Sequence, residues 1–430
     1  MGTKSLVSVC GVALALGCGG SLDAVSEPAP ERPKPDSAPS LTDSEPSVAN
    51  GDVRVERRQS SAWQFLVADP GQPYGRGRLT LSGYDLSLLL DAAGTPHIAY
   101  TAGLSQLGDQ LRHAWLEGGV FQSDVVDEYS RAHKSWLRGA PELRLVYNNY
   151  SYASIGFQAR RDEGGSWSRE TFEVSGDAAA ISGTWRDGRA QIAYVSALSS
   201  ASNETKQGVT FADSDLPDAF VEYAYERVDA FSSLAIDASG TAHLLYTAPA
   251  REIPKLSEKL PAAVRYVTVR DGVWSEPETL TEPGHYAGLS LVIDGEGLSH
   301  VSFTRSRPLD SELLTQASEV IYLTRAAGNA DWQRVLLPAG SGAVASRESL
   351  AVTADGTVLL AYCALDAEGG RCGGLRLATL RDGAWSSESI DDGCVDLGAL
   401  ATVQLAADGS VHVAYQGCER ELMYAVRSGG

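Results

Sequence analysis

The stretch Leu89-Leu-Asp-Ala-Ala-Gly-Thr-Pro-His-Ile-Ala-Tyr100 decides the fold, because close copies of it recur along the chain. Three of these copies are Ala235-Ile-Asp-Ala-Ser-Gly-Thr-Ala-His-Leu-Leu-Tyr246, Val292-Ile-Asp-Gly-Glu-Gly-Leu-Ser-His-Val-Ser-Phe303 and Gln404-Leu-Ala-Ala-Asp-Gly-Ser-Val-His-Val-Ala-Tyr415. Each copy has an apolar run, a Gly where a tight turn needs a positive φ, and a second β-rich run. This order predicts a β-hairpin in every copy.

Weaker copies keep only the spacing between the turn, a following polar or apolar residue, and a closing aromatic residue. With these copies included, the aromatic recurs at intervals of 47 to 59 residues, at Tyr100, Tyr147, Tyr194, Tyr246, Phe303, Tyr362 and Tyr415. A period near this length is typical of propellers and other repeat arrays. The seven copies therefore predict seven repeats.

Two further strands follow each hairpin. Val264-Arg-Tyr-Val-Thr-Val-Arg-Asp-Gly-Val-Trp274 shows a third strand and a second turn, and the Trp that opens a fourth strand recurs at Trp167, Trp332 and Trp385, with Phe220 in the third copy. Four strands per repeat are typical of a propeller blade. The sequence thus predicts an all-β fold, a seven-bladed β-propeller over residues 60–430.

The last copy stops at Met423-Tyr-Ala-Val-Arg-Ser-Gly-Gly430, after its third strand. At the other end of the folded part, Ser60-Ser-Ala-Trp-Gln-Phe-Leu-Val67 matches the fourth strand of the other copies. We therefore expect the N-terminal strand to complete the last blade. Closing the ring in this way removes the unpaired strand edges of an open array.

The first 59 residues have features of an export and localisation signal. Lys4 and the apolar run from Leu6 to Leu16 have the layout of a secretory signal, and Leu14-Ala-Leu-Gly-Cys18 resembles the lipobox of bacterial lipoproteins. We expect residues 1–18 to be the signal, Cys18 to be acylated, and the Pro-, Ser- and Glu-rich residues 19–59 to be a disordered tether. By this resemblance Gly19 implies an outer-membrane location; an ordinary cleaved signal remains the alternative.

Charge and cysteines limit the partners. The 35 Lys and Arg residues against 55 Asp and Glu residues give a net charge of −20, which disfavours nucleic acid as a partner. We expect a monomer without cofactor or metal, contacting membrane only through its lipid. The four later cysteines predict two disulfides, Cys363 with Cys372 and Cys394 with Cys418, although other pairings stay open.

The second turn carries a family resemblance. Arg270-Asp-Gly-Val-Trp-Ser275 and Arg381-Asp-Gly-Ala-Trp-Ser386 resemble a degraded Asp box of sialidase-like (BNR-type) propellers, but they lack the Ser or Thr two places before the Asp. Sialidases usually have six blades and bind a carboxylate with three arginines, and no such triad is assigned here. The first hairpin also resembles repeats of seven-bladed polysaccharide lyases. Their catalytic His after the aromatic has no counterpart at Thr101, Asn148, Val195, Thr247, Thr304, Cys363 or Gln416.

A histidine recurs beside the first turn at His97, His243, His300 and His412. A ring of metal ligands is one interpretation of these residues. Because the position is fixed by the repeat and holds Gln191, Arg144 and Leu359 in other copies, a structural hydrogen bond is the better explanation.

Function is expected on the face that bears the loops between blades and the loops joining strands two and three, called the loop face below. The inter-blade loops are expected to present Tyr84, Asp85, Arg131, His133, Lys134, His285, Tyr286, Arg347 and Glu348. The loops after the aromatic are expected to present Asn148, Asn149, Tyr150, Tyr152, Arg305 and Arg307. Such side chains suit a glycan or protein ligand. Two hypotheses remain. The protein is a binding module, or it is a glycan hydrolase or lyase. The catalytic pair of such an enzyme would be His133 with Tyr84 or Tyr286, or else Asp85 with Glu348.

Overall fold

The structure of this protein is a computed structural model. Its contacts divide the chain into two units, Met1–Arg54 and Val55–Gly430, and all the described residues lie in the second. These residues are 62–70, 86–104, 108–128, 134–138, 140–148, 155–162, 164–173, 177–199, 205–213, 216–225, 232–249, 262–306, 319–326, 331–337, 343–345, 349–365, 372–392, 401–417 and 421–429. Every regular element among them is a strand, and they include no helix able to cross a membrane.

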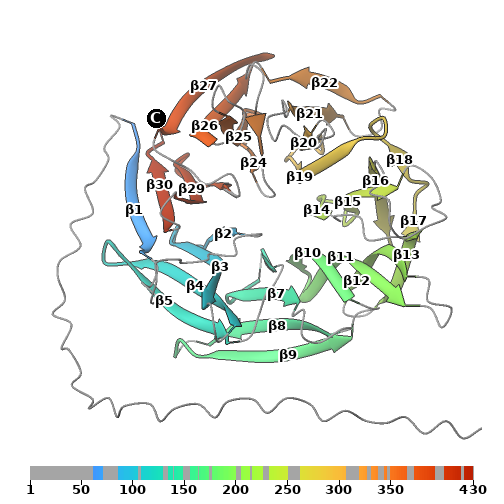
Figure 1. The fold of residues 1–430 in the computed structure, drawn as a ribbon, viewed down its shortest axis with the longest axis horizontal. Coiled ribbons are helices and arrows are strands. Elements are labelled where there is room, and N and C mark those ends of the chain that lie inside the picture. The colour runs from blue at the N-terminus through green and yellow to red at the C-terminus, as the bar shows by residue number, and fades with distance from the viewer. Residues whose placement is uncertain are drawn as a thin grey trace, which may run out of the picture. The chain divides into compact units, whose positions relative to one another are not determined.

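The described strands form seven antiparallel sheets arranged as the blades of a propeller ring (Figure 1). The innermost strands are β2 (Ser87–Leu90), β6 (Lys134–Trp136), β10 (Asp177–Arg186), β14 (Ser232–Ile236), β19 (His285–Ile293), β23 (Ala343–Val344) with β24 (Leu350–Val352), and β28 (Thr402–Leu405). The second strands are β3 (Pro96–Leu104), β7 (Arg144–Asn148), β11 (Arg189–Ser199), β15 (Ala242–Pro249), β20 (Ser299–Ser306), β25 (Val358–Leu365) and β29 (Val411–Gln416). The blades are numbered 1 to 7 in this order. The predicted seven-bladed propeller is confirmed.

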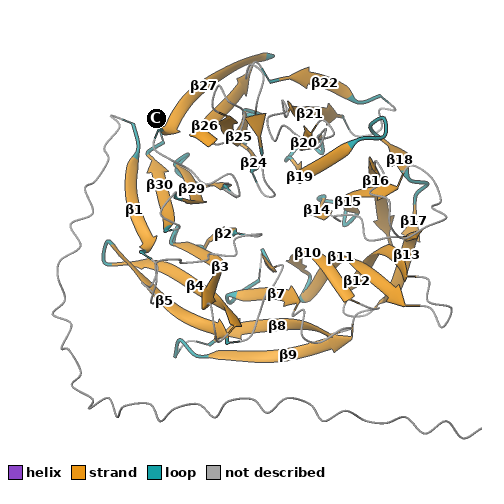
Figure 2. Ribbon diagram, in the orientation of Figure 1, coloured by secondary structure: helices purple, strands orange, loops and turns teal. Residues whose placement is uncertain are grey.

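The outer half of each blade follows the same order, and Figure 2 shows strands and loops but no helix among the described residues. The third strands are β4 (Gly108–Glu117), β8 (Ile155–Arg161), β12 (Thr205–Asp213), β16 (Ala262–Arg270), β21 (Glu319–Arg325), β26 (Cys372–Arg381) and β30 (Leu422–Arg427). The outermost strands are β5 (Val120–Asp127), β9 (Trp167–Glu173), β13 (Leu216–Tyr225), β17 (Val273–Trp274) with β18 (Glu278–Thr279), β22 (Gln333–Leu336), β27 (Ala384–Asp391) and β1 (Gln64–Asp69).

Two details differ from the simple repeat. The outer strand of blade 4 is split into β17 and β18, and Pro277 lies between them, where its missing N–H cannot join the ladder. In blade 3 the outer strand begins at Leu216, so Phe220 lies in the middle of the strand and does not open it as the sequence suggested. That blade lacks the Asp-Gly turn that precedes the Trp in blades 4 and 6.

The repeated Asp at the first turn explains why the hairpin forms there. In blade 5 the Oδ1 atom of Asp294 accepts the backbone N–H of Glu296 at 2.9 Å and of Leu298 at 2.8 Å. Gly297 follows with φ +83°, a conformation that costs little only for glycine. The side chain of Asp294 thereby satisfies donors that the tight turn leaves unpaired.

Strand β1 closes the ring. It pairs antiparallel with β30, with Gln64 opposite Val426 and Phe65 opposite Ala425, and Figure 1 shows the blue β1 beside the red β30. Trp63, directly before β1, is 1% exposed and packs in the core between blades 6 and 7. The predicted completion of the last blade by the N-terminal strand is confirmed.

The hydrophobic core is distributed around the ring. The described buried side chains form seven clusters, and each cluster fills the space between two neighbouring blades. The inner strands also contact each other in ring order, including β24 with β28 and β28 with β2. Each blade therefore depends on both neighbours for its buried surface.

This closure predicts that residues 1–70 can be removed only at the cost of the fold. Their loss removes Trp63 and Phe65 from the core and leaves β30 as an open edge, and losing one buried aromatic alone costs about 3–5 kcal/mol. We expect the chain lacking residues 1–70 to be insoluble or unfolded by circular dichroism. The control lacking residues 1–59 keeps β1 and should fold; cooperative unfolding of the shorter chain would contradict the closure.

Candidate functional site

The recurring histidines are buried hydrogen-bonding groups. In blade 5, Nε2 of His300 lies 3.1 Å from Oδ2 of Asp294, and Nδ1 lies 2.6 Å from the Tyr322 hydroxyl. His243 and His412 contact Tyr266 and Tyr424 in the same way. The predicted structural hydrogen bond is confirmed. Among the described residues, no group of three or more His, Cys, Asp or Glu side chains is arranged to hold a metal ion.

Each of these units also reaches the next blade. The Tyr322 ring meets Trp385 of blade 6 edge to face at 5.6 Å between centroids, and Tyr266 meets Trp332 of blade 5 at 5.1 Å. Burial raises the pKa of Tyr322 to about 12, so the phenol stays protonated and can donate. The Asp, His, Tyr and Trp positions of the repeat together fasten one blade to its neighbour.

Blade 1 breaks this pattern with a second histidine. Nδ1 of His97 lies 3.0 Å from Nε2 of His113, and the outer nitrogens of the pair lie 3.4 Å from Asp91 and 3.2 Å from Asp124. Three contacts need three N–H groups, whereas two neutral imidazoles supply two. Full satisfaction would therefore require one extra proton, which the nearby Arg161 guanidinium, 3.3 Å from Asp124, opposes.

Tyrosines also lie between blades just beneath the loop face. The Tyr147 hydroxyl donates to Oδ2 of Asp127, the last residue of β5 in the preceding blade, at 2.9 Å. Tyr415 donates likewise to Asp391 at the end of β27, at 2.7 Å. These bonds fix the ends of the outer strands and give the loop face a rigid base.

Most of the loop-face residues expected from the sequence lie outside the described residues. These are Tyr84, Asp85, Arg131, His133, Asn149, Tyr150, Tyr152, Arg307, Arg347 and Glu348. Cys18, Cys394 and Cys418 also lie outside them, and their roles stay predictions. Lys134 opens β6, but its side chain is not among those described.

The remaining expected residues lie on strands, which corrects the loop assignment made from the sequence. His285 and Tyr286 belong to β19, and Arg305 belongs to β20, because the two strands pair out to His285 opposite Ser306. Tyr286 is 8% exposed, packs edge to face on Phe303, and donates its hydroxyl to the Glu282 carbonyl at 2.7 Å. The Arg305 side chain is exposed.

Tyr286 and Arg305 meet in a groove of about 480 Å³ between blades 4 and 5. The groove opens at the loop face, where β18 runs into the inter-blade segment 280–284. Its lining is Ala263, Arg265, Thr279, Leu280, Thr281, Glu282, Pro283, Tyr286, Phe303, Arg305, Ile321, Leu323 and Arg334. Its volume falls within the range of about 300–1,000 Å³ common for small-ligand sites.

The groove combines charged, polar and apolar groups. The Arg305 side chain forms no hydrogen bond or ion pair with another described residue, whereas Arg334 is paired with Glu319 at 2.9 Å. The Thr281 hydroxyl accepts the Val264 amide at 3.0 Å and holds the inter-blade segment against β16. The sequence alone did not indicate Arg265, Thr279 or Arg334, because they come from third and fourth strands of two blades.

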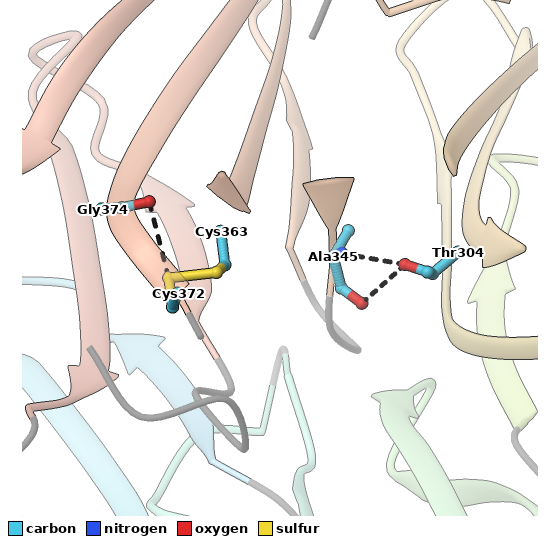
Figure 3. Close-up of a disulfide and its surroundings, with 5 residues drawn as sticks. All are labelled: Thr304, Ala345, Cys363, Cys372 and Gly374. Atoms are coloured by element: carbon cyan, nitrogen blue, oxygen red, sulfur yellow. Dashed lines mark hydrogen bonds between the residues drawn. A yellow bond between two sulfur atoms is a disulfide. The ribbon is translucent and has the colours of Figure 1, made fainter. Parts of the chain in front are cut away.

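The predicted disulfide in blade 6 is present. Cys363 of β25 and Cys372 of β26 are bonded, with 5.5 Å between their Cα atoms, and they close the loop between these strands (Figure 3). Figure 3 also shows the backbone of Ala345, which donates its N–H to the Thr304 hydroxyl of blade 5 at 2.8 Å. The pairing of Cys363 with Cys372 is confirmed.

Comparisons with known proteins found only distant structural similarity. No protein-family model matches the chain, and no curated protein sequence is significantly similar to it. Solved structures with a similar fold include the polysaccharide lyase Uly1 (9% identity, 84% of this chain and 97% of that chain covered, TM-score 0.49) and Penicillium chrysogenum α-L-arabinanase (13%, 85% and 97%, 0.47). Another is the NanB sialidase of Streptococcus pneumoniae (9%, 84% and 71%, 0.39). All three TM-scores are below 0.5, so neither fold nor function is inferred from these proteins.

The buried histidines predict that acid weakens the fold. Burial, and then the nearby His113, lowers the pKa of His97 from 6.5 to about 4, and burial lowers the pKa of His113, His243 and His412 in the same direction. Below pH 6.5 the histidines of the unfolded chain bind protons that the buried histidines of the folded chain do not bind. The free energy of unfolding therefore decreases as the pH is lowered. His97 alone contributes about 3 kcal/mol to this loss by pH 4.

Urea denaturation between pH 7 and pH 4 measures the effect. In His97→Gln, which introduces the residue that blade 3 carries as Gln191, we expect stability to fall less steeply with pH. An unchanged slope would show that His97 does not titrate as its burial requires.

Proposed function

We propose that this protein is an exported binding module that holds a glycan on the loop face of its propeller, in the groove between blades 4 and 5. The observation that carries the proposal is the exposed Arg305, without a described partner, beside the buried aromatic wall of Tyr286 and Phe303. Sugars present both hydroxyl groups and apolar C–H surfaces, and such a mixed lining suits both.

The rigid support of the groove favours binding without rearrangement. Phe303 is fully buried, Tyr286 is fixed through the Glu282 carbonyl, and Thr281 is fixed through the Val264 amide. Groups held in advance lose little conformational entropy when a ligand binds. Exposed Glu282 and Thr279 add acceptors and a hydroxyl at the rim.

Catalysis of glycan hydrolysis is the less favoured alternative. Glycosidases of the usual kind place two carboxyl groups on opposite sides of the scissile bond. Among the described residues that line the groove, Glu282 supplies the one carboxyl group. The groove therefore fits recognition better than acid–base chemistry.

A bulky residue at the groove should abolish binding. Thr279→Trp fills the rim from the exposed strand β18, and we expect at least a tenfold loss of signal for every glycan that the wild-type protein binds on a glycan array. The matched control is Val273→Trp, at the opposite end of the same blade edge, where the valine is 71% exposed. Equal binding by both variants would place the site elsewhere, and no glycan bound by the wild type would end the glycan proposal.

We also propose that the propeller is held at the outer membrane through an acylated Cys18. The support is the sequence alone: a short apolar run, a small residue before the Cys, and a tether-like segment to residue 59. A tether of about 40 residues lets a binding face sample ligands away from the membrane.

Metabolic labelling with a fatty-acid analogue tests this anchor. We expect label in the membrane fraction for the wild-type protein and none for Cys18→Ser, because the thiol is the acylated atom. Unlabelled wild-type protein released into the medium would contradict the anchor, and it would leave the groove proposal untouched.

A further inference from the structure

The charge of the groove is distinctive in this protein. The whole chain carries a net charge of −20, yet Arg265, Arg305 and Arg334 line one groove with Glu282 as the single lining carboxylate. Arg334 is partly neutralised by Glu319, its partner at 2.9 Å. Arg305 is a different case, because its cross-strand neighbours are Tyr286 and Glu319 and it is paired with neither through an ion pair or side-chain hydrogen bond.

The position of Arg305 suits a ligand better than a structural role. It is the penultimate residue of β20, so its backbone is fixed by the ladder with β19 and β21 while its side chain stays exposed. A guanidinium presents N–H groups in a planar fork that matches a carboxylate, which allows two parallel hydrogen bonds. A group held in this way can bind an anion without ordering any further chain.

The rest of the groove adds features that a free anion would not use. Half-buried Leu280 and the 8% exposed Tyr286 contribute apolar lining, with Phe303 buried behind Tyr286, and exposed Glu282 offers a hydrogen-bond acceptor. Glu282 would repel a second anion placed beside it, but it accepts hydrogen bonds from hydroxyl groups. The complementary ligand is therefore one negative charge on a ring that carries several hydroxyl groups and an apolar face.

We propose that the groove is a subsite for a carboxylated sugar residue, such as a uronate, with its carboxylate on Arg305 and a hydroxyl group on Glu282. This inference rests on the proposed glycan-binding function and names the class of sugar. The subsite lies between two blades, away from the centre of the ring. Because Arg305 is exposed, its loss should cost binding of the acid and leave the fold intact.

Isothermal titration calorimetry of the full-length protein with D-glucuronate and with D-glucose tests the subsite. We expect D-glucuronate to bind at least tenfold more tightly than D-glucose, and added salt to weaken it. Arg305→Gln should abolish this preference, and Arg305→Lys should keep part of it. The control Arg270→Gln removes an exposed arginine from the far end of β16 and should bind as the wild type does.

Each other outcome has a distinct meaning. Equal affinity for the two sugars, or wild-type binding by Arg305→Gln, overturns the carboxylate subsite. Inorganic sulfate that binds as tightly as D-glucuronate shows an anion site that ignores the sugar ring, which also overturns it. If the protein binds neutral glycans and Thr279→Trp loses that binding, the proposed function stands while this inference fails. If the protein binds no sugar or glycan at all, both fail.

Discussion

The pairing of β1 with β30 is the constraint on which the rest of the structure depends. Each described core cluster lies between two blades, so no blade has a complete core of its own. Blade 7 takes its outer strand from the N-terminal part of the unit and its other strands from the C-terminal part. The pairing also covers the edge of β30, which would otherwise be free to pair with another chain. Closure is thus both the source of stability and the protection against aggregation.

Inside the closed ring, hydrogen bonds within a blade orient the tyrosine ring that contacts the next blade. Asp294, His300 and Tyr322 run from a turn through two strands, and the Tyr322 ring then meets Trp385 of the next blade. Hydrogen bonds of this kind are directional, so they fix the orientation of the Tyr322 ring that blade 5 presents to blade 6. In blade 4 the corresponding Tyr266, bound to His243, belongs to the core cluster between blades 4 and 5, which also contains the groove residues Tyr286 and Phe303.

The sequence predicted the fold well because the same contacts occur in several blades, and they require the same residue types at the same spacing. The aromatic residue at the end of the hairpin recurs in all seven blades and is buried in each, and the His beside the turn recurs in four, so together they mark the repeat. The candidate site was harder to predict. Tyr286 and Arg305 were named but placed on loops, since strand ends depend on pairing partners distant in the chain. Arg265 and Arg334 were missed, because residues of third and fourth strands meet only between folded blades.

Hydrogen exchange of β1 tests the central claim, the closed ring, most directly. We predict that those amides of Gln64–Val67 that donate to β30 exchange as slowly in the native protein as the amides of Leu422–Val426, within about tenfold, because both strands open only in global unfolding. Added urea should increase the exchange rate of both sets of amides to the same extent. Fast, urea-independent exchange at every amide of Gln64–Val67, with full protection of Leu422–Val426, would show that β1 frays alone, and would contradict the dependence of the fold on its pairing.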